Sequence, residues 1–188
     1  KLFVLSTSRL TDSGEVMGRE EKELIRYAMW SSEPIPFDPM EVALHNEYSR
    51  QHETDERINY KLVHEYPLDG KPPMMTHVFE SASGHRIIAA KGAPEALIKV
   101  SDLTNDELNK VNEALNLLTI GGYRVLAVGA ASLDGYNYPE MQQHFKFNFK
   151  GLVAFYDPPK ENIKAVFEAF YKAGISIKIV TGDNAVTT

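Results

Sequence analysis

A stretch in the middle of the chain decides the fold. Residues 76–95 read THVFESASGHRIIAAKGAPE. Two runs rich in apolar and β-branched residues, 76–80 and 86–90, flank a turn that contains Ser and Gly, which is the pattern of a β-hairpin. The sequence KGAPE follows directly, and its Pro94 is preset for the first turn of a short helix. A hairpin that leads straight into a helix indicates a sheet packed against helices.

Further elements lie on both sides of this hairpin. Strand-like patterns, in which apolar residues cluster or alternate, cover residues 61–66, 124–131 and 145–155. Helical patterns, in which apolar residues recur three and four apart, cover residues 20–30, about 39–50 and about 105–120. About five strands in series, joined mostly by short turns, predict the α+β class: an antiparallel sheet flanked by helices.

Two of the predicted helices carry start signals. Asp38 precedes a proline and stands three residues before Glu41, as in a capping box. Thr104 and Glu107 form a second capping box. Glu41 also has a functional interpretation, because its carboxylate could accept a hydrogen bond from an exocyclic amine.

The pattern changes near residue 157. The segment Asp157-Pro158-Pro159-Lys160 contains two consecutive prolines, which cannot continue a central strand. An amphipathic helix over about 161–173 and an apolar strand over 175–180 follow, and a helix that leads into a β-branched strand is typical of a parallel α/β sheet. We therefore predict two units, residues 1–156 and residues 157–188. The chain is also expected to be part of a larger protein.

Composition narrows the function classes. The chain has 188 residues, 43% of them hydrophobic and 24% charged, which is ordinary globular usage. A formal net charge of −6 makes nucleic acid an unexpected partner. With no cysteine, the sequence has no disulfide, Cys-ligated zinc site or cysteine nucleophile. It contains neither GxxxxGK[ST] nor GxGxxG, and its histidines lack HExxH spacing.

Three local patterns could carry chemistry, and each also has a structural interpretation. Lys91 comes just before a predicted helix start, and the lysine and the helix N-terminus would both favour an anion there. Its structural interpretation is a solvated lysine on an ordinary turn. Thr181-Gly182-Asp183 follows the end of a predicted strand, where ligands bind in α/β sheets, or it is a polar turn. Arg124 either contacts phosphate or pairs with an acidic side chain.

The order of the motifs is more specific than any one of them. Six occur in one order along the chain: DPxExAL from Asp38, EYPLD from Glu65, KGAPE from Lys91, GYRVLA from Gly122, DPPK from Asp157 and TGDN from Thr181. This order resembles the P-type ATPases, the cation pumps with a phosphorylated intermediate, in the form of bacterial pumps of the calcium-pump-like branch.

The resemblance implies an architecture and a site. It implies a nucleotide-binding domain over residues 1–156, followed by a hinge and part of a haloacid-dehalogenase-like phosphorylation domain over residues 157–188. The nucleotide-binding residues that it implies are Asp38, Glu41, Leu68, Lys91, Gly92, Ala93 and Arg124. Glu41 and Lys91 take the adenine end and Arg124 the phosphate side. The resemblance also implies that Thr181, Gly182 and Asp183 belong to the phosphoryl site of the full-length pump, where Asp183 would be a ligand of Mg²⁺.

The sequence also departs from the family. Leu68 stands where the family often has an adenine-stacking aromatic residue, and Tyr66 or Phe79 could supply that contact instead. A basic residue expected some five positions later falls at Pro73, with Lys71 as the nearest substitute. The DKTGT motif that carries the phosphorylated aspartate is absent from this sequence.

The expected function is that of an ATP-binding cytosolic domain in a cation-transporting P-type ATPase. Its partners would be ATP, the rest of the phosphorylation domain, the actuator domain and the membrane helices of the same polypeptide. It would lie at the cytoplasmic face of the membrane, with Mg²⁺ as a cofactor of the whole enzyme. Two alternatives stay open: a non-catalytic ligand-binding or interaction domain, and the cap of a soluble phosphatase of the haloacid-dehalogenase type.

Overall fold

A computed structural model describes residues 2–5, 10–12, 17–156, 161–178 and 180. Its centre is a seven-stranded sheet in the order β2-β1-β7-β6-β5-β4-β3, in which every neighbouring pair of strands is antiparallel. The strands are β1 Leu2–Leu5, β2 Leu10–Asp12, β3 Tyr60–Asp69, β4 Met74–Ser81, β5 Arg86–Gly92, β6 Arg124–Ala131 and β7 Phe147–Phe155. The predicted antiparallel sheet is confirmed, and β1 and β2 are additions that the sequence patterns did not indicate.

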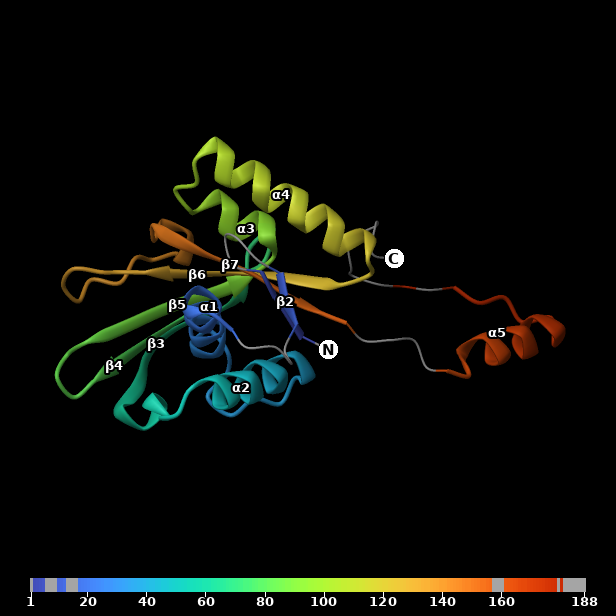
Figure 1. Cartoon of the computed structure of the whole chain (residues 1–188), viewed down its shortest axis with the longest axis horizontal. Coiled ribbons are helices and arrows are strands. Elements are labelled where there is room, and N and C mark those ends of the chain that lie inside the picture. Colours follow the sequence, from blue (N-terminus) through green and yellow to red (C-terminus); the bar gives the residue numbers. More distant parts are fainter. Residues whose placement is uncertain (1, 6–9, 13–16, 157–160, 179, 181–188) are drawn as a thin grey trace.

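Helices cover both faces of this sheet, which gives three layers (Figure 1). The helices α1 Arg19–Trp30 and α2 Pro39–Gln51 lie on one face, and α3 Pro94–Lys99 and α4 Asn105–Ile120 lie on the other. Two short 3₁₀ helices, η1 Glu56–Asn59 and η2 Gln142–His144, lie in connections between elements. The flanking helices predicted at 20–30, 39–50 and 105–120 are all present.

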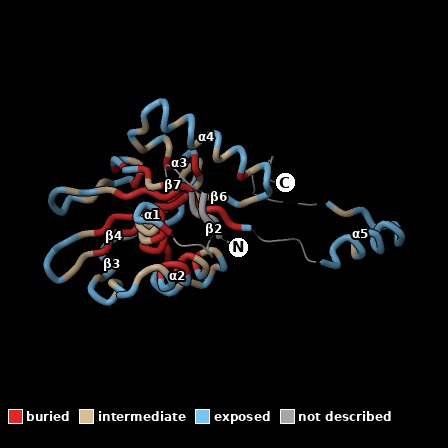
Figure 2. The backbone as a smooth tube through the Cα atoms, viewed as in Figure 1, coloured by how far each residue is buried: buried red, intermediate tan, exposed pale blue. Residues whose placement is uncertain are grey.

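Alternation along the strands supplies two cores, one on each face of the sheet. In β5, Ile87 and Ala89 pack with Leu24 of α1, whereas Ile88 and Ala90 pack in the opposite core with α3 and α4. Because the central strands are buried on both faces, the strongest burial runs through the middle layer (Figure 2). Because β5 is held within this layer, the position of its last residues, where the KGAPE motif begins, is also fixed.

The two start signals have different outcomes. In α4 both halves of the capping box are present: Thr104 accepts from the Glu107 amide, and Glu107 Oε2 accepts from the Thr104 amide at 2.8 Å. In α2, Asp38 caps the helix by accepting from the Met40 amide at 2.8 Å. The Glu41 side chain does not complete a box, because it points to Lys91 instead. The structural interpretation of Glu41 is therefore wrong.

The predicted second unit is described in part. The helix is present as α5, Ile163–Lys172. The strand predicted over 175–180 is not formed in residues 175–178 or at Val180, where the backbone has no regular structure. A strand of a parallel sheet needs a neighbouring strand for its hydrogen bonds, and no described strand pairs with this segment. The division at residue 157 stays a prediction.

Across the described part of the chain, none of the helices combines the length and the apolar character needed to cross a bilayer.

Candidate functional site

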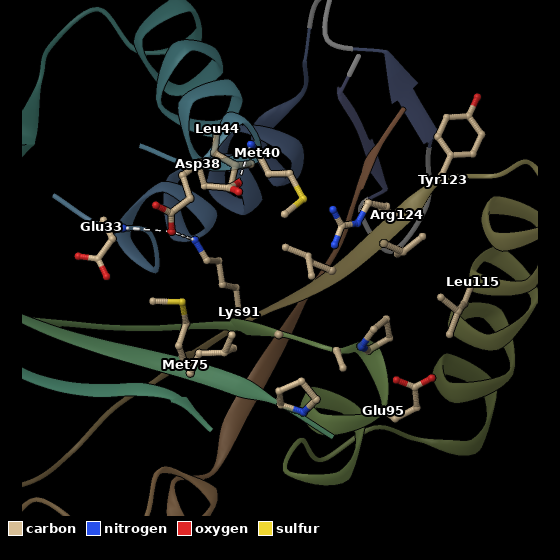
Figure 3. A pocket seen from close by; sticks show the side chains of 18 of the residues that line it. Glu33, Asp38, Met40, Leu44, Met75, Lys91, Glu95, Leu115, Tyr123 and Arg124 are labelled. Carbon is tan, nitrogen blue, oxygen red and sulfur yellow. Dashed lines mark hydrogen bonds and ion pairs between the residues drawn. The ribbon is translucent and has the colours of Figure 1, made fainter. Parts of the chain in front are cut away.

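A pocket of about 650 Å³ opens beside the end of β5. It lies between the α1–α2 loop and the start of α2 on one side, and β6 and the second half of α4 on the other (Figure 3). All seven residues that the resemblance implied for nucleotide binding line it: Asp38, Glu41, Leu68, Lys91, Gly92, Ala93 and Arg124. The fold thus brings together residues from four separate motifs, while their role in binding stays a prediction.

An ion pair between Lys91 and Glu41 lies at one end of the pocket. Lys91 Nζ is 2.5 Å from Glu41 Oε1 and also donates to Ser32 Oγ at 2.8 Å. Both charged residues are buried, with 6% of Lys91 and 8% of Glu41 exposed. Burial lowers the pKa of the Lys91 ammonium, and the hydrogen bond to Glu41 opposes this effect. Lys91 is therefore not solvated, so the structural interpretation of its motif is wrong, while its role in binding an anion stays a prediction.

One carboxylate oxygen of Glu41 accepts no hydrogen bond from the described residues. Its Oε1 takes the Lys91 ammonium and, at 3.3 Å, the amide of Glu33. Its Oε2 is buried and has no hydrogen-bond partner in the described part of the chain. A buried carboxylate oxygen without a donor is costly, so a donor brought by a ligand would be favourable at this position.

Gly92 is required by the sheet. A Cβ added to Gly92 would lie 2.6 Å from Met74 Cα and 2.6 Å from the carbonyl oxygen of Pro73, so any side chain would collide with the backbone of β4. The missing side chain of Gly92 thus allows the close approach of a neighbouring strand and the residue before it. Ala93 follows, and its amide donates to the Pro73 carbonyl at 2.9 Å, which holds the turn into α3.

Arg124 lines a different part of the pocket from Lys91. It is the first residue of β6 and is exposed, and Figure 3 shows its guanidinium well apart from the Lys91 ammonium. The pocket therefore has one end with a buried Lys–Glu pair and another with an accessible guanidinium. A guanidinium is suited to bidentate binding of phosphate oxygens.

The apolar wall includes the predicted Leu68 and also Phe37, which sequence reasoning missed. Leu68 is 65% exposed at the end of β3, and Phe37, from the α1–α2 loop, is 85% exposed. The alternatives to Leu68 fail, because Tyr66 is buried and donates to the Pro139 carbonyl, and Phe79 packs against Trp30 in the core. Phe37 immediately precedes the DPxExAL motif, and that adjacency was the available signal.

Two other expectations concern residues near this wall or beyond it. Pro73 lines the pocket, whereas Lys71, considered as a substitute for a missing basic residue, does not belong to the lining. Thr181, Gly182 and Asp183 lie outside the described residues, so their assignment to a phosphoryl and Mg²⁺ site stays a prediction.

Comparison with known protein families identifies the fold. The model of the family described as P-type ATPase, cytoplasmic domain N, matches residues 34–162, which is more than half of the chain. The chain belongs to this family. The match covers α2 to β7 and includes the ion pair and every residue of the pocket lining except Glu33. It supports the N domain over the two alternatives, an unrelated interaction domain and a phosphatase cap.

Individual relatives are cation-transporting ATPases. The N domain is 28% identical to the calcium-transporting ATPase of Bacillus subtilis, over 69% of this chain and 16% of that protein. It is 28% identical to a sodium/potassium exporting P-type ATPase of Schizosaccharomyces pombe, over 80% of this chain and 16% of that protein. It is 27% identical to calcium-transporting ATPase 1 of Saccharomyces cerevisiae, over 87% of this chain and 19% of that protein.

The chain spans between 16% and 19% of the length of these three relatives. The names of the relatives differ in the ion that is moved. The calcium-pump-like branch therefore stays a prediction, while membership of the P-type ATPase family is established.

Proposed function

We propose that the pocket beside β5 binds ATP, and that the N domain presents this ATP to a phosphorylatable aspartate elsewhere in a cation-transporting P-type ATPase. The observation that most supports this is the free acceptor of Glu41. Its Oε2 is buried and has no donor among the described residues, and the neighbouring Lys91 donates to Oε1 instead. The exocyclic amine of adenine is a donor of the required kind.

The two ends of the pocket suggest an orientation for the nucleotide. Adenine lies at the Glu41 end, against the apolar side chains of Met75, Leu68 and Phe37. The phosphates extend toward Arg124, whose guanidinium supplies charge-assisted hydrogen bonds. In this orientation the Lys91–Glu41 pair fixes the geometry of the amine acceptor, and Lys91 makes no direct contact with phosphate.

In the whole enzyme, positioning is the main contribution of the N domain. Phosphoryl transfer relies on alignment and on electrostatic stabilisation, so a domain that holds the base and the α-phosphate can deliver the γ-phosphate by closing toward its partner domain. The proposed acceptor is an aspartate of the phosphorylation domain. Mg²⁺ would be held there with the phosphates by Thr181 and Asp183, whose oxygen atoms are ligands that this ion prefers.

Isothermal titration calorimetry with ATP and adenosine tests the proposal. Arg124→Ala is expected to weaken ATP binding by about 1.5–3 kcal/mol, the usual value of a hydrogen bond to a charged group, and to leave adenosine binding unchanged. Arg19→Ala, an exposed arginine at the start of α1, is the matched control. Saturable ATP binding that is indifferent to Arg124→Ala would contradict the orientation, and the lack of saturable binding would contradict the function.

A further inference from the structure

A second cluster of charged and metal-ligating side chains shares one residue, Glu33, with the lining of the pocket. It consists of Glu33 from the α1–α2 loop, Glu65 from β3 and His77 from β4. Glu65 and His77 are directly opposite each other in the antiparallel register of β3 and β4. One ligand atom from each of the three side chains lies within 4.8 Å of the other two.

The histidine of this cluster is held in one tautomer. His77 is completely buried, and its Nδ1 is 3.1 Å from the carbonyl oxygen of Ser32. A carbonyl oxygen only accepts hydrogen bonds, so Nδ1 carries a proton, and in the neutral ring Nε2 therefore presents the lone pair. This Nε2 is buried and has no hydrogen-bond partner among the described residues.

The surroundings of Nε2 favour a cation. A neutral imidazole whose Nδ1–H donates to a backbone carbonyl is the form in which histidine binds metal ions. Two carboxylates beside its lone pair supply negative charge but no donor, so the group is unsatisfied without a proton or a metal ion.

We propose that Glu33, Glu65 and His77 bind a divalent transition-metal ion such as Zn²⁺. One imidazole nitrogen and two carboxylate oxygens form a three-ligand set that leaves a fourth position for water. Ligand atoms around tetrahedral Zn²⁺ lie about 3.4 Å apart, given bonds of about 2.0–2.2 Å. The exposed Glu65 closes the remaining distance by rotating its side chain, and it also gives the ion a route from solvent.

The site shares one short segment with the pocket. Ser32 accepts the Lys91 ammonium through its hydroxyl and His77 through its carbonyl, and the Glu33 amide donates to Glu41. An ion bound to Glu33 and His77 would therefore hold a segment that also lines the pocket. The ion site itself does not depend on ATP binding, and its test needs no nucleotide.

Competition for Zn²⁺ against a chromophoric chelator tests the site with the chain as it exists. We expect one equivalent of Zn²⁺ to bind. Glu65→Gln and Glu33→Gln should each weaken this binding at least tenfold, since loss of even a supporting group typically has an effect of about 10–100-fold. Glu113→Gln, which makes the same charge change on the exposed side of α4, should bind Zn²⁺ like the parent chain.

Nitrogen-15 NMR of the histidine rings gives an independent readout. Zn²⁺ is expected to shift the Nε2 resonance of His77 while Nδ1 stays protonated, and Glu65→Gln should reduce that shift at a given Zn²⁺ concentration. The proposal is overturned if the His77 ring is doubly protonated and unresponsive to Zn²⁺. It is also overturned if Glu65→Gln and Glu33→Gln bind Zn²⁺ as tightly as Glu113→Gln.

Discussion

The ion pair between Lys91 and Glu41 determines the polar character of one end of the pocket. Both groups are almost fully buried, and Lys91 donates to Glu41 the shortest hydrogen bond that either of them makes. A buried pair of this kind adds little net stability compared with apolar residues, but the removal of one partner leaves an uncompensated charge.

We therefore predict that removing Lys91 destabilises the chain strongly and that a second substitution at Glu41 restores the stability. Lys91→Met should lower the free energy of unfolding by about 3–5 kcal/mol, because the Glu41 carboxylate is left buried without its counterion. Adding Glu41→Leu to Lys91→Met should restore most of that loss. Urea unfolding measures both, with Lys99→Met on the exposed face of α3 as the control. A double variant no more stable than Lys91→Met would show that the pair is not the cause.

The exposed aromatic ring at the pocket mouth leads to a prediction about base recognition. Stacking of a base on an aromatic side chain is worth about 1–3 kcal/mol, so Phe37→Ala should weaken the binding of ATP and of adenosine by that amount. Leu68→Phe should tighten both by roughly 0.5–1.5 kcal/mol, the excess of an aromatic pair over plain area burial. Calorimetry gives these affinities.

Two controls belong to this series. Ile35→Ala removes a side chain that is 86% exposed in the same loop but does not line the pocket, and it should leave ATP affinity unchanged. Inorganic triphosphate, which has no base, should bind Phe37→Ala and the parent chain equally. If Phe37→Ala and Leu68→Phe both bind ATP like the parent chain, the base lies elsewhere.

At the scale of elements, α4 closes the pocket without supplying its charged groups. Leu115 and Thr119, which line the pocket, lie in its second half, whereas the capping box lies at its start. The box satisfies two amide groups that have no partner within the helix. Stability and ligand binding should therefore be separable along this helix.

We predict that Thr104→Ala lowers the free energy of unfolding by about 1 kcal/mol, the usual loss for an N-cap residue. ATP affinity should stay within a factor of two, since the pocket-lining turns are at the other end of the helix. Asn109→Ala, an exposed change in the first half of α4, should not destabilise the chain. An ATP affinity that fell with Thr104→Ala but not with Asn109→Ala would mean that the two ends of the helix are coupled.

Features that depend on residues close in sequence could be predicted, whereas features that depend on distant partners could not. The Thr104 capping box and strand β6 depend on neighbours in sequence, and both were predicted within a residue. The Asp38–Glu41 pattern has the same local form, but the side chain of Glu41 is drawn away by Lys91, a partner 50 positions along the chain. Pairing of β1 with β7 is equally remote, so a four-residue apolar run gave no signal of it.

The candidate site shows the same division. Its seven predicted residues could be named because motif order resembles a family, and family motifs mark residues that a fold brings together. The direction in which Lys91 points could not be predicted, because it depends on Ser32 and Glu41 from other elements. Phe37 and the cluster of Glu33, Glu65 and His77 were missed for the same reason, since no local pattern joins the loop to β3 and β4.

At the scale of the whole molecule, the three layers explain why one pocket can join so many motifs. The end of β5 and the start of β6 lie next to the starts of α2 and α3. This end of the sheet therefore brings together residues from four parts of the chain (Figures 1 and 3). Because the central strands are buried on both faces, this end is rigidly supported. Such support suits the proposed ATP site, because the proposed function is to position the nucleotide.

The central claim is that ATP binds at this end of the sheet, with its base beside Glu41 and its phosphates toward Arg124. Amide chemical shifts of the nitrogen-15-labelled chain during an ATP titration test it most directly. We predict saturable shifts that cluster at Glu33, Glu41, Gly92, Ala93 and Arg124. Adenosine should reproduce the shifts at Glu33 and Glu41, and inorganic triphosphate those at Arg124. Shifts that do not saturate, or that cluster on residues outside this pocket, would contradict the account.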